Sequence, residues 1–143
     1  MADLGAGPIA VDTPVFIYFI EAHPKFQPLI TPLFQAADKR DRQLVTSALT
    51  LLEVLVLPYR LRNLQLAAEY EAILTRAQGL TVVRIDHEQL RTAAEIRATT
   101  RIKTPDALQL AAALKNGCKS FLTNDRKLPS LPGLSIVDLG KYA

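Results

Sequence analysis

A chain of 143 residues that is 49% hydrophobic is long enough to bury one core and too apolar to be disordered. Its net charge of +3, from 17 basic and 14 acidic residues, permits a polyanionic partner without requiring one. The single cysteine, Cys118, excludes an intramolecular disulfide framework, and with only His23 and His87 besides, a zinc site of Cys and His ligands is not expected.

The start of the chain, MADLGAGPIA, has no basic segment and no long apolar run. We therefore expect no secretory signal, a flexible lead-in over residues 1–8, one domain over residues 9–143 and a cytoplasmic location. The uncharged stretch from Gln43 to Leu52 is short and contains polar residues, so no membrane span is expected either.

The first half of the chain predicts two strands and four helices. Residues 9–12 (IAVD) have the pattern of a buried strand, and Pro14 fits the start of a helix that Asp12 or Thr13 caps. Helices are predicted over residues 25–38, despite two prolines, over 48–60 and over 63–78, where Gly79 stops the last of them. Residues 42–47 predict a short strand between the first two of these three helices.

The second half continues the alternation of strands and helices. Strands are predicted over residues 80–86, 119–123 and 134–139, and helices over 87–100, capped by Asp86, and over 105–116. Thr104 is the expected cap of the last helix, Pro105 its first residue, and Gly117 its end. The pattern favours a mainly parallel sheet covered by helices on both faces, which binds ligands outside the carboxyl ends of its strands.

Four acidic residues stand where acids are unexpected. Asp12 and Asp125 follow predicted strands, and Asp106 opens the apolar helix in KTPDALQLAAAL. Glu53 is the only charged residue between Arg42 and Arg60. The other acids lie among basic and polar residues and indicate solvated faces, and Asp138, at the end of the last strand, is interpreted as a loop acid.

Each of the four acids also has a local explanation. Asp12 suits a helix cap, Glu53 a pair with an arginine, Asp106 the dipole of its helix, and Asp125 a turn with Asn124. The predicted topology nevertheless directs all four to one crevice, where like charges repel each other and need compensation. Without a set of histidines or cysteines, the natural compensating ion is Mg²⁺ or Mn²⁺. Such an ion can catalyse phosphodiester cleavage. The sequence contains neither a GxSxG motif nor a P-loop, so these alternative chemistries are not indicated.

Four segments resemble the PIN domain family, and specifically its VapC-type toxins of toxin–antitoxin modules. They are IAVDTPVFIYFIE, TSALTLLEVL, KTPDALQLAAAL and FLTNDRKL, and they spread in the family's order from residue 9 to residue 128. The resemblance implies a PIN-like α/β/α sandwich with a parallel sheet of four or five strands. It also implies a metal-dependent endoribonuclease that uses Mg²⁺ or Mn²⁺.

The resemblance implies roles for single residues as well. Asp12, Glu53 and Asp106 match the three core catalytic and metal-binding acids, and Asp125 matches a more variable fourth one. Thr13 and Asn124 match positions that support the site through hydrogen bonds. Relatives are commonly dimers and are inhibited by an antitoxin, so a homodimer and a cognate antitoxin are expected partners. The ten or so residues before Asp12 depart from many toxins, which start almost at the strand.

Two other functions remain open beside the toxin. One is a PIN nuclease that acts in RNA processing or on DNA outside a toxin pair. The other is a non-catalytic RNA-binding or scaffold module of the same fold, which the presence of all four acids disfavours. A phosphoacceptor domain of the response-regulator kind is not indicated, because its paired acids after the first strand are missing.

Two surfaces are expected to bind partners. Five basic residues flank the segments of Asp106 and Asp125 and are candidates for contacts with RNA phosphates, although they also suit a solubilising surface: Arg97, Arg101, Lys103, Arg126 and Lys127. The segments 25–36 and 55–74 carry many apolar residues. These residues suit either plain core packing or a surface for a dimer or for an antitoxin helix.

Overall fold

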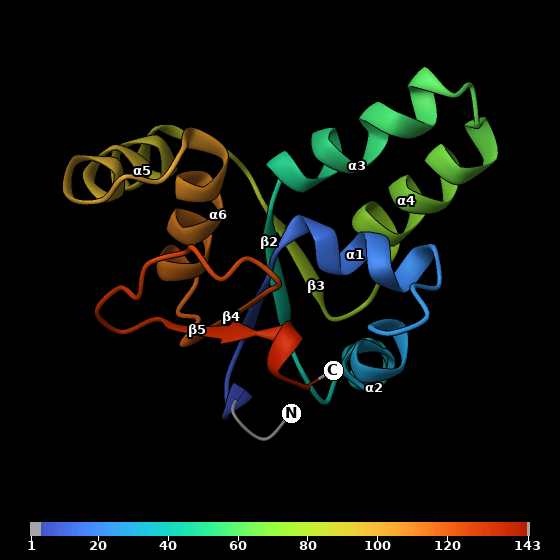
Figure 1. Ribbon diagram of the computed structural model, residues 1–143, viewed down its shortest axis with the longest axis horizontal. Coiled ribbons are helices and arrows are strands. Elements are labelled where there is room, and N and C mark those ends of the chain that lie inside the picture. The colour runs from blue at the N-terminus through green and yellow to red at the C-terminus, as the bar shows by residue number, and fades with distance from the viewer. Residues whose placement is uncertain (1–3, 143) are drawn as a thin grey trace.

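The computed structural model describes residues 4–142, in which five short strands alternate with six helices (Figure 1). The strands are β1 (Ile9–Val11), β2 (Leu44–Ser47), β3 (Leu80–Val83), β4 (Ser120–Thr123) and β5 (Ser135–Asp138). The helices are α1 (Thr13–Ile20), α2 (Gln27–Asp38), α3 (Leu49–Arg60), α4 (Leu64–Arg76), α5 (His87–Thr99) and α6 (Thr104–Lys115), and a 3-10 turn, η2 (Leu139–Tyr142), follows β5.

All five strands are parallel, in the order β3-β2-β1-β4-β5. The chain places β2 and β3 on one side of β1 and then returns to place β4 and β5 on the other. The winding direction therefore reverses between β1 and β4, and an open α/β sheet has its ligand crevice outside the carboxyl ends of the strands at this point. The predicted three-layer sandwich with a parallel sheet is confirmed.

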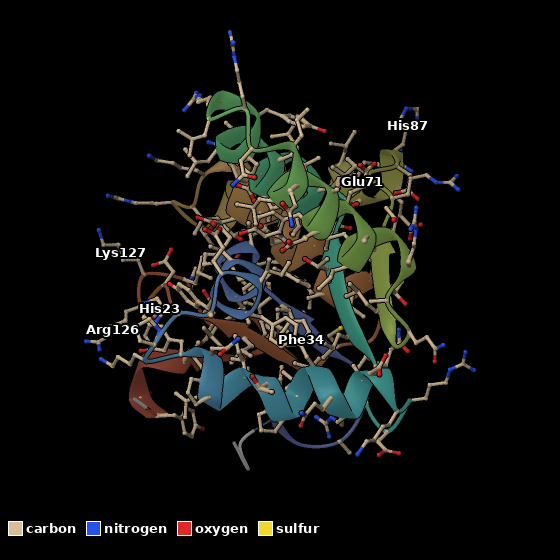
Figure 2. All side chains as sticks on the ribbon, turned by 90° about the vertical axis from the view of Figure 1, so that its right-hand side faces the viewer. His23, Phe34, Glu71, His87, Arg126 and Lys127 are labelled. Atoms are coloured by element: carbon tan, nitrogen blue, oxygen red, sulfur yellow. The ribbon has the colours of Figure 1, made fainter. Side chains whose placement is uncertain are left out.

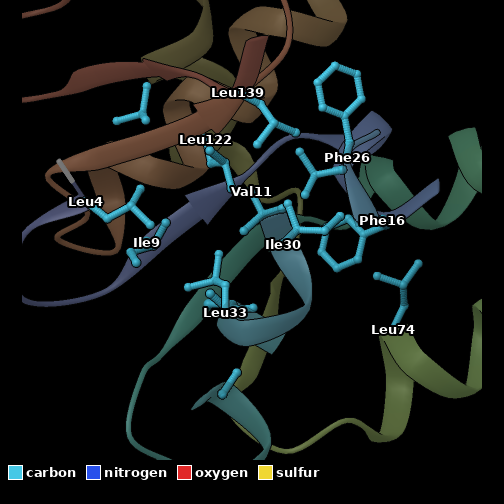
Figure 3. Packing of buried hydrophobic residues seen from close by; sticks show 14 of the residues in the cluster. Leu4, Ile9, Val11, Phe16, Phe26, Ile30, Leu33, Leu74, Leu122 and Leu139 are labelled. Atoms are coloured by element: carbon cyan, nitrogen blue, oxygen red, sulfur yellow. The ribbon is translucent and has the colours of Figure 1, made fainter. Parts of the chain in front are cut away.

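The two faces of the sheet carry separate cores because side chains alternate along each strand. Ile9 and Val11 join a cluster with residues of α1 to α4, in which Val11, Ile30 and Leu122 pack together (Figure 3). Ala10 faces the opposite side and belongs to a second cluster with residues of α5 and α6. Helices thus cover both faces, α5 and α6 on one and α1 to α4 mainly on the other (Figure 1).

Most element ends lie within one or two residues of the prediction, and two of the differences have a clear physical cause or consequence. The third strand stops at Val83, not at residue 86, because its neighbour β2 ends at Ser47, the partner of Val83. Helix α6 starts at Thr104, so Lys103 and not Thr104 is its N-cap residue, and no side chain caps it. The Thr104 hydroxyl instead accepts a hydrogen bond from Arg97 Nη1 at 3.0 Å. The predicted caps Asp12 and Asp86 are both confirmed.

Part of the segment predicted as a flexible lead-in, residues 1–8, packs on the domain. Leu4 is buried in the core, and its carbonyl accepts a hydrogen bond from the Ser120 hydroxyl at 2.8 Å. Residues 1–3 lie outside the described residues. Within residues 4–142, none of the helices has the length and apolar character that crossing a bilayer requires.

Gly79 and Gly117, which follow α4 and α6, have positive φ angles of +73° and +70°, which favour glycine. Helix α4 already ends at Arg76, so the prediction that Gly79 stops it is wrong, and Gly79 lies in the turn before β3. Gly117 directly follows Asn116, the C-cap of α6. A Cβ on Gly79 would lie 2.1 Å from the Ala37 carbonyl oxygen at the end of α2, whereas a Cβ on Gly117 would meet nothing within 4 Å. Both glycines therefore need a left-handed backbone conformation, but only Gly79 lacks room for a Cβ atom.

Replacing either glycine with alanine separates these two effects. Gly117→Ala adds only backbone strain and is expected to lower the free energy of unfolding by about 1–2 kcal/mol. Gly79→Ala adds a backbone clash and should lower it by about 2–5 kcal/mol. Urea denaturation of both variants measures the difference, and equal losses would contradict the close approach of Gly79 to α2.

Candidate active site

The four predicted acids meet at the point where the winding of the sheet reverses. Asp12 follows β1, and its backbone N–H donates to the Leu122 carbonyl of β4 at 3.0 Å. Asp125 comes two residues after β4, Glu53 lies in α3 and Asp106 in the first turn of α6. The charges of Glu53 and Asp106 act on Asp12, and those of Glu53 and Asp125 act on Asp106. All four carboxylates therefore share one electrostatic environment.

Asp12 is the most buried of these acids, with 7% of its surface exposed. Its Oδ1 accepts from the Thr13 backbone N–H at 2.9 Å, and its Oδ2 accepts from the Thr123 hydroxyl at 2.7 Å. The pKa of Asp12 is raised to about 6, mainly by burial and in part by the charges of Asp106 and Glu53, while the two hydrogen bonds oppose the shift. Asp12 is thus both a helix cap, as its local explanation predicts, and a member of the carboxylate cluster.

Glu53 is held by a hydroxyl and not by an arginine. The Thr13 hydroxyl donates to Glu53 Oε1 at 2.7 Å. The ion pairs found within residues 4–142 join Lys115 to Asp86 and Glu88, and Arg126 to Asp138, so Glu53 belongs to none of them. The alternative that Glu53 pairs with an arginine is therefore wrong, and Thr13 makes the kind of supporting hydrogen bond expected of it.

Asp106 and Asp125 line an open cleft of about 650 Å³ together with Arg101, Lys103 and Lys127. Burial raises the pKa of Asp106, the charges of Asp125 and Glu53 raise it further, and Lys103 opposes the shift. Asp125 Oδ1 accepts from the Lys127 backbone N–H at 2.8 Å, which is the turn role that its local explanation predicts. Asp125 makes this bond and still lines the cleft.

Asn124 and Asp138 lie beside the carboxylate cluster in a second set of contacts. The amide of Asn124 donates to the Tyr18 hydroxyl at 3.1 Å, so it ties the end of β4 to α1 and does not bond to the acids. Asp138 ends the last strand, as predicted, but it is not a loop acid. It is the last residue of β5, is buried, accepts a hydrogen bond from the Gly140 backbone N–H at 2.9 Å, and forms an ion pair with Arg126, whose Nε lies 3.3 Å from its Oδ2.

The five predicted RNA-binding residues fall into two groups. Arg101, Lys103 and Lys127 line the cleft. Arg97 bonds to the Ile102 carbonyl and the Thr104 hydroxyl, while Arg126 pairs with Asp138, so both have partners within the protein. Figure 2 shows Arg126 and Lys127 extending outward on the same side of the molecule.

The donor chemistry of the acids fits a hard divalent cation. All four candidate ligands are carboxylates, the oxygen donors that Mg²⁺ and Mn²⁺ prefer. Among residues 4–142, however, no three Asp, Glu, His or Cys side chains stand close enough around one point to hold an ion. The four carboxylates therefore lie close enough to interact electrostatically, but they do not form the coordination shell of a metal ion.

Several uncharged residues of the site are not among the predicted ones. Gln109 is 2% exposed and Thr50 is fully buried, and both bond to Thr13. Thr123 joins Asp12 to the backbone of Asp125. The only sequence signal for Gln109 is a lone amide in the apolar run DALQLAAAL, and threonines at strand ends carry no distinctive signal.

The buried charge of Asp12 makes a prediction about stability and pH in the metal-free protein. A carboxyl group with a raised native pKa binds its proton more tightly when folded, so stability falls as pH rises from about 4 through about 6. In EDTA at pH 8, Asp12→Asn should be more stable than the original chain by on the order of 3 kcal/mol, with no difference near pH 4. Thermal or urea unfolding across pH measures this, and a variant that is less stable at pH 8 would contradict it.

Comparisons with known proteins agree with this architecture. A model of the PIN domain matches residues 9–134, while a search of curated proteins finds no match.

VapBC2 from Rickettsia felis, solved bound to a promoter DNA fragment, superposes with a TM-score of 0.70 at 17% identity, covering 92% of this chain and 98% of that one. VapC20 from Mycobacterium tuberculosis, described as a sarcin–ricin loop cleaving toxin, gives 0.67 at 20% identity, covering 83% and 91%. FitAcB from Neisseria gonorrhoeae gives 0.64 at 17% identity, covering 92% and 98%. These structures share the fold, and because the family model spans most of the chain, the protein belongs to the PIN domain family.

Proposed function

We propose that the protein is a divalent-metal-dependent endoribonuclease, the toxin of a toxin–antitoxin pair, which hydrolyses RNA phosphodiesters with a metal-activated water molecule. The observation that carries this proposal is the group of four carboxylates at the reversal point of a PIN domain. The pKa values of Asp12 and Asp106 are raised, partly by the other acids. None of the ion pairs within residues 4–142 neutralises any of the four. A cation that binds there would relieve their repulsion.

Asp12, Glu53, Asp106 and Asp125 are the residues that would hold Mg²⁺ or Mn²⁺. When bound, such an ion lowers the pKa of a water molecule and neutralises charge on the phosphoryl oxygens. The chain itself holds the carboxylates in place, with Thr123 and the Thr13 backbone on Asp12 and the Thr13 hydroxyl on Glu53.

RNA would reach these acids along the cleft. Arg101, Lys103 and Lys127 lie on its walls beside Asp106 and Asp125, where they suit the phosphates on either side of the scissile bond. Arg97 and Arg126 have partners within the protein and therefore contribute less to this track. An RNA target implies that the protein acts in the cytoplasm.

The two apolar segments expected to bind partners differ in the structure. In residues 25–36, Phe26, Ile30 and Leu33 are buried in the core. In contrast, six large apolar side chains along α3 and the start of α4 are exposed, and we call them the apolar ridge: Leu52, Val56, Leu57, Tyr59, Leu61 and Leu64. Exposed apolar surface of this extent marks an interaction site.

We assign the apolar ridge to a second copy of the chain, which would form the homodimer. A separate cleft of about 410 Å³ lies between α2 and α4, lined by Phe19, Phe34, Ile73 and other residues. Its concave apolar shape suits side chains inserted by an antitoxin segment. The structural relatives support an antitoxin partner, since those from Rickettsia felis and Klebsiella pneumoniae were solved as toxin–antitoxin assemblies.

The dimer is tested by light scattering at high micromolar concentration. The original chain should be dimeric, and Leu61→Glu with Leu64→Glu should be monomeric and still folded, because both side chains are exposed in the monomer. Its melting temperature should fall only by the stabilisation that dimer formation gives the native state. Leu90→Glu, which changes an exposed leucine of α5 outside the apolar ridge, should remain dimeric. A monomeric original chain would contradict the assignment.

Cleavage of a mixed RNA panel tests the proposed activity. EDTA should abolish cleavage, Mg²⁺ or Mn²⁺ should restore it, and the products should carry 5′-phosphate and 3′-hydroxyl ends because water is the nucleophile. Asp106→Asn should reduce the rate by roughly 100-fold or more. Asp41→Asn, an exposed acid before β2 at the opposite edge of the sheet, serves as the control and should cleave normally. Undiminished cleavage after thorough chelation would refute the mechanism.

A further inference from the structure

A cluster of buried polar side chains lies behind Glu53, between the ends of β1 and β2 and the helices α3 and α6. Its members, which we call the buried polar cluster, are Thr13, Thr46, Ser47, Thr50 and Gln109. Each has at most 6% of its surface exposed. Buried polar groups are costly unless their hydrogen bonds are satisfied, so this cluster has a defined arrangement.

The orientation of the Gln109 amide follows from a backbone group. The Ser47 backbone N–H can only donate, and it lies 3.2 Å from Gln109 Oε1. The carbonyl oxygen of the amide must therefore face Ser47. The amide nitrogen then faces the Thr50 hydroxyl at 2.8 Å and the Thr13 hydroxyl at 3.2 Å. A flipped amide would place two donors against each other at Ser47.

This orientation fixes the direction of the next hydrogen bonds. The oxygens of Thr13 and Thr50 accept from Gln109, and each hydroxyl keeps one proton to donate. The Thr13 proton goes to Glu53 Oε1 at 2.7 Å. The Thr46 hydroxyl donates to the Val11 carbonyl at 2.9 Å, so Thr50 can donate to Thr46, whose oxygen lies 2.7 Å away. The donor and acceptor roles of Gln109, Thr13, Thr46 and Thr50 are then mutually compatible.

We propose that Gln109 is a positioning residue of the carboxylate site. Its amide accepts from Ser47 and donates to Thr13, which turns the Thr13 hydroxyl toward Glu53 and holds that carboxylate in one orientation. Without the amide, the Thr13 proton is free to turn toward the Thr50 oxygen, 3.0 Å away, and Glu53 loses its only hydroxyl partner among the described residues. The inference rests on the proposed metal site, because it assigns Gln109 the support of one of the metal ligands.

Binding of Mn²⁺ alone, measured without RNA by the electron paramagnetic resonance signal of free Mn²⁺, tests this role. Gln109→Met keeps the length of the side chain and removes both amide groups. It should bind Mn²⁺ about 10-fold or more weakly, as expected when a partner of a metal ligand is lost. Thr13→Val should weaken binding to a similar degree, and the double variant should lose little more, because both changes break one chain of hydrogen bonds. Thr13→Ser, which keeps the hydroxyl, should restore binding.

Gln89 supplies a matched control. It is a second fully buried glutamine, and its amide bonds to the Ser47 hydroxyl and the Leu108 carbonyl without touching Thr13 or Glu53. Gln89→Met should destabilise the fold while leaving Mn²⁺ affinity within about twofold, since Gln89 bonds to the Ser47 hydroxyl and not to the Ser47 backbone N–H that orients Gln109. Equal losses of affinity in the Gln89→Met and Gln109→Met variants, or normal affinity in a folded Gln109→Met, would overturn the proposal.

A measurement on the unaltered chain covers the case in which Gln109→Met does not fold. In nuclear magnetic resonance spectra, the side-chain amide protons of Gln109 should show stronger contacts with the side chains of Thr13 and Thr50 than with the Ser47 amide proton. The reverse order of intensities would mean a flipped amide and would overturn the proposal. An original chain that binds no Mn²⁺ at all would instead refute the proposed metal site.

Discussion

The burial of an ionisable carboxyl group at the end of β1 is the constraint on which the rest of this site depends. Asp12 follows directly from a strand whose three residues are all buried, so the topology carries its charge into the interior. Burial and two neighbouring acids raise its pKa to about 6, which shows that the native fold disfavours the ionised form. A structure maintained only for stability has no reason to gather further acids there. The arrangement is explained if a cation offsets the cost.

The polar residues around the acids are arranged to keep them in place. Threonines at the ends of β4 and α1 donate to Asp12 and Glu53, and Gln109 sets the direction of the Thr13 hydroxyl. These contacts join the ends of β1 and β4 to the helices α1, α3 and α6. The geometry of the acids therefore depends on the correct packing of both layers of helices against the sheet, and a change far from the cleft can disturb it.

Much of this architecture could be predicted from the sequence because its main signals are local. Alternation of apolar strands with helices indicated the sheet. The positions of Asp12 and Asp125 just after predicted strands, and of Glu53 and Asp106 in apolar helices, marked the acids. Features that depend on tertiary contacts could not be predicted in this way. The third strand is short because β2 ends early, and Asp138 is buried because Arg126 and the Gly140 backbone N–H satisfy it.

Gln109 shows the same limit at the site itself. An amide within an apolar helix is compatible with solvent exposure, with a satisfied core position or with a role at the site, and the pattern does not distinguish these. Only the approach of the Ser47 backbone N–H determines which way the amide points. The exposed apolar ridge is similar, because the sequence shows a surplus of apolar residues without showing that Leu61 and Leu64 stay on the surface while Ile30 and Leu33 form the core.

The location of bound Mn²⁺ tests the central claim most directly. Anomalous scattering from crystals of the protein soaked in Mn²⁺ would give the position of the ion without reference to activity. The proposed site predicts a peak within coordination distance of the Asp12 and Asp106 carboxylates, with Glu53 and Asp125 drawn toward it, and no such peak in Asp106→Asn crystals. A peak at another place on the molecule, or none in protein that cleaves RNA with Mn²⁺, would contradict the carboxylate cluster as the metal site.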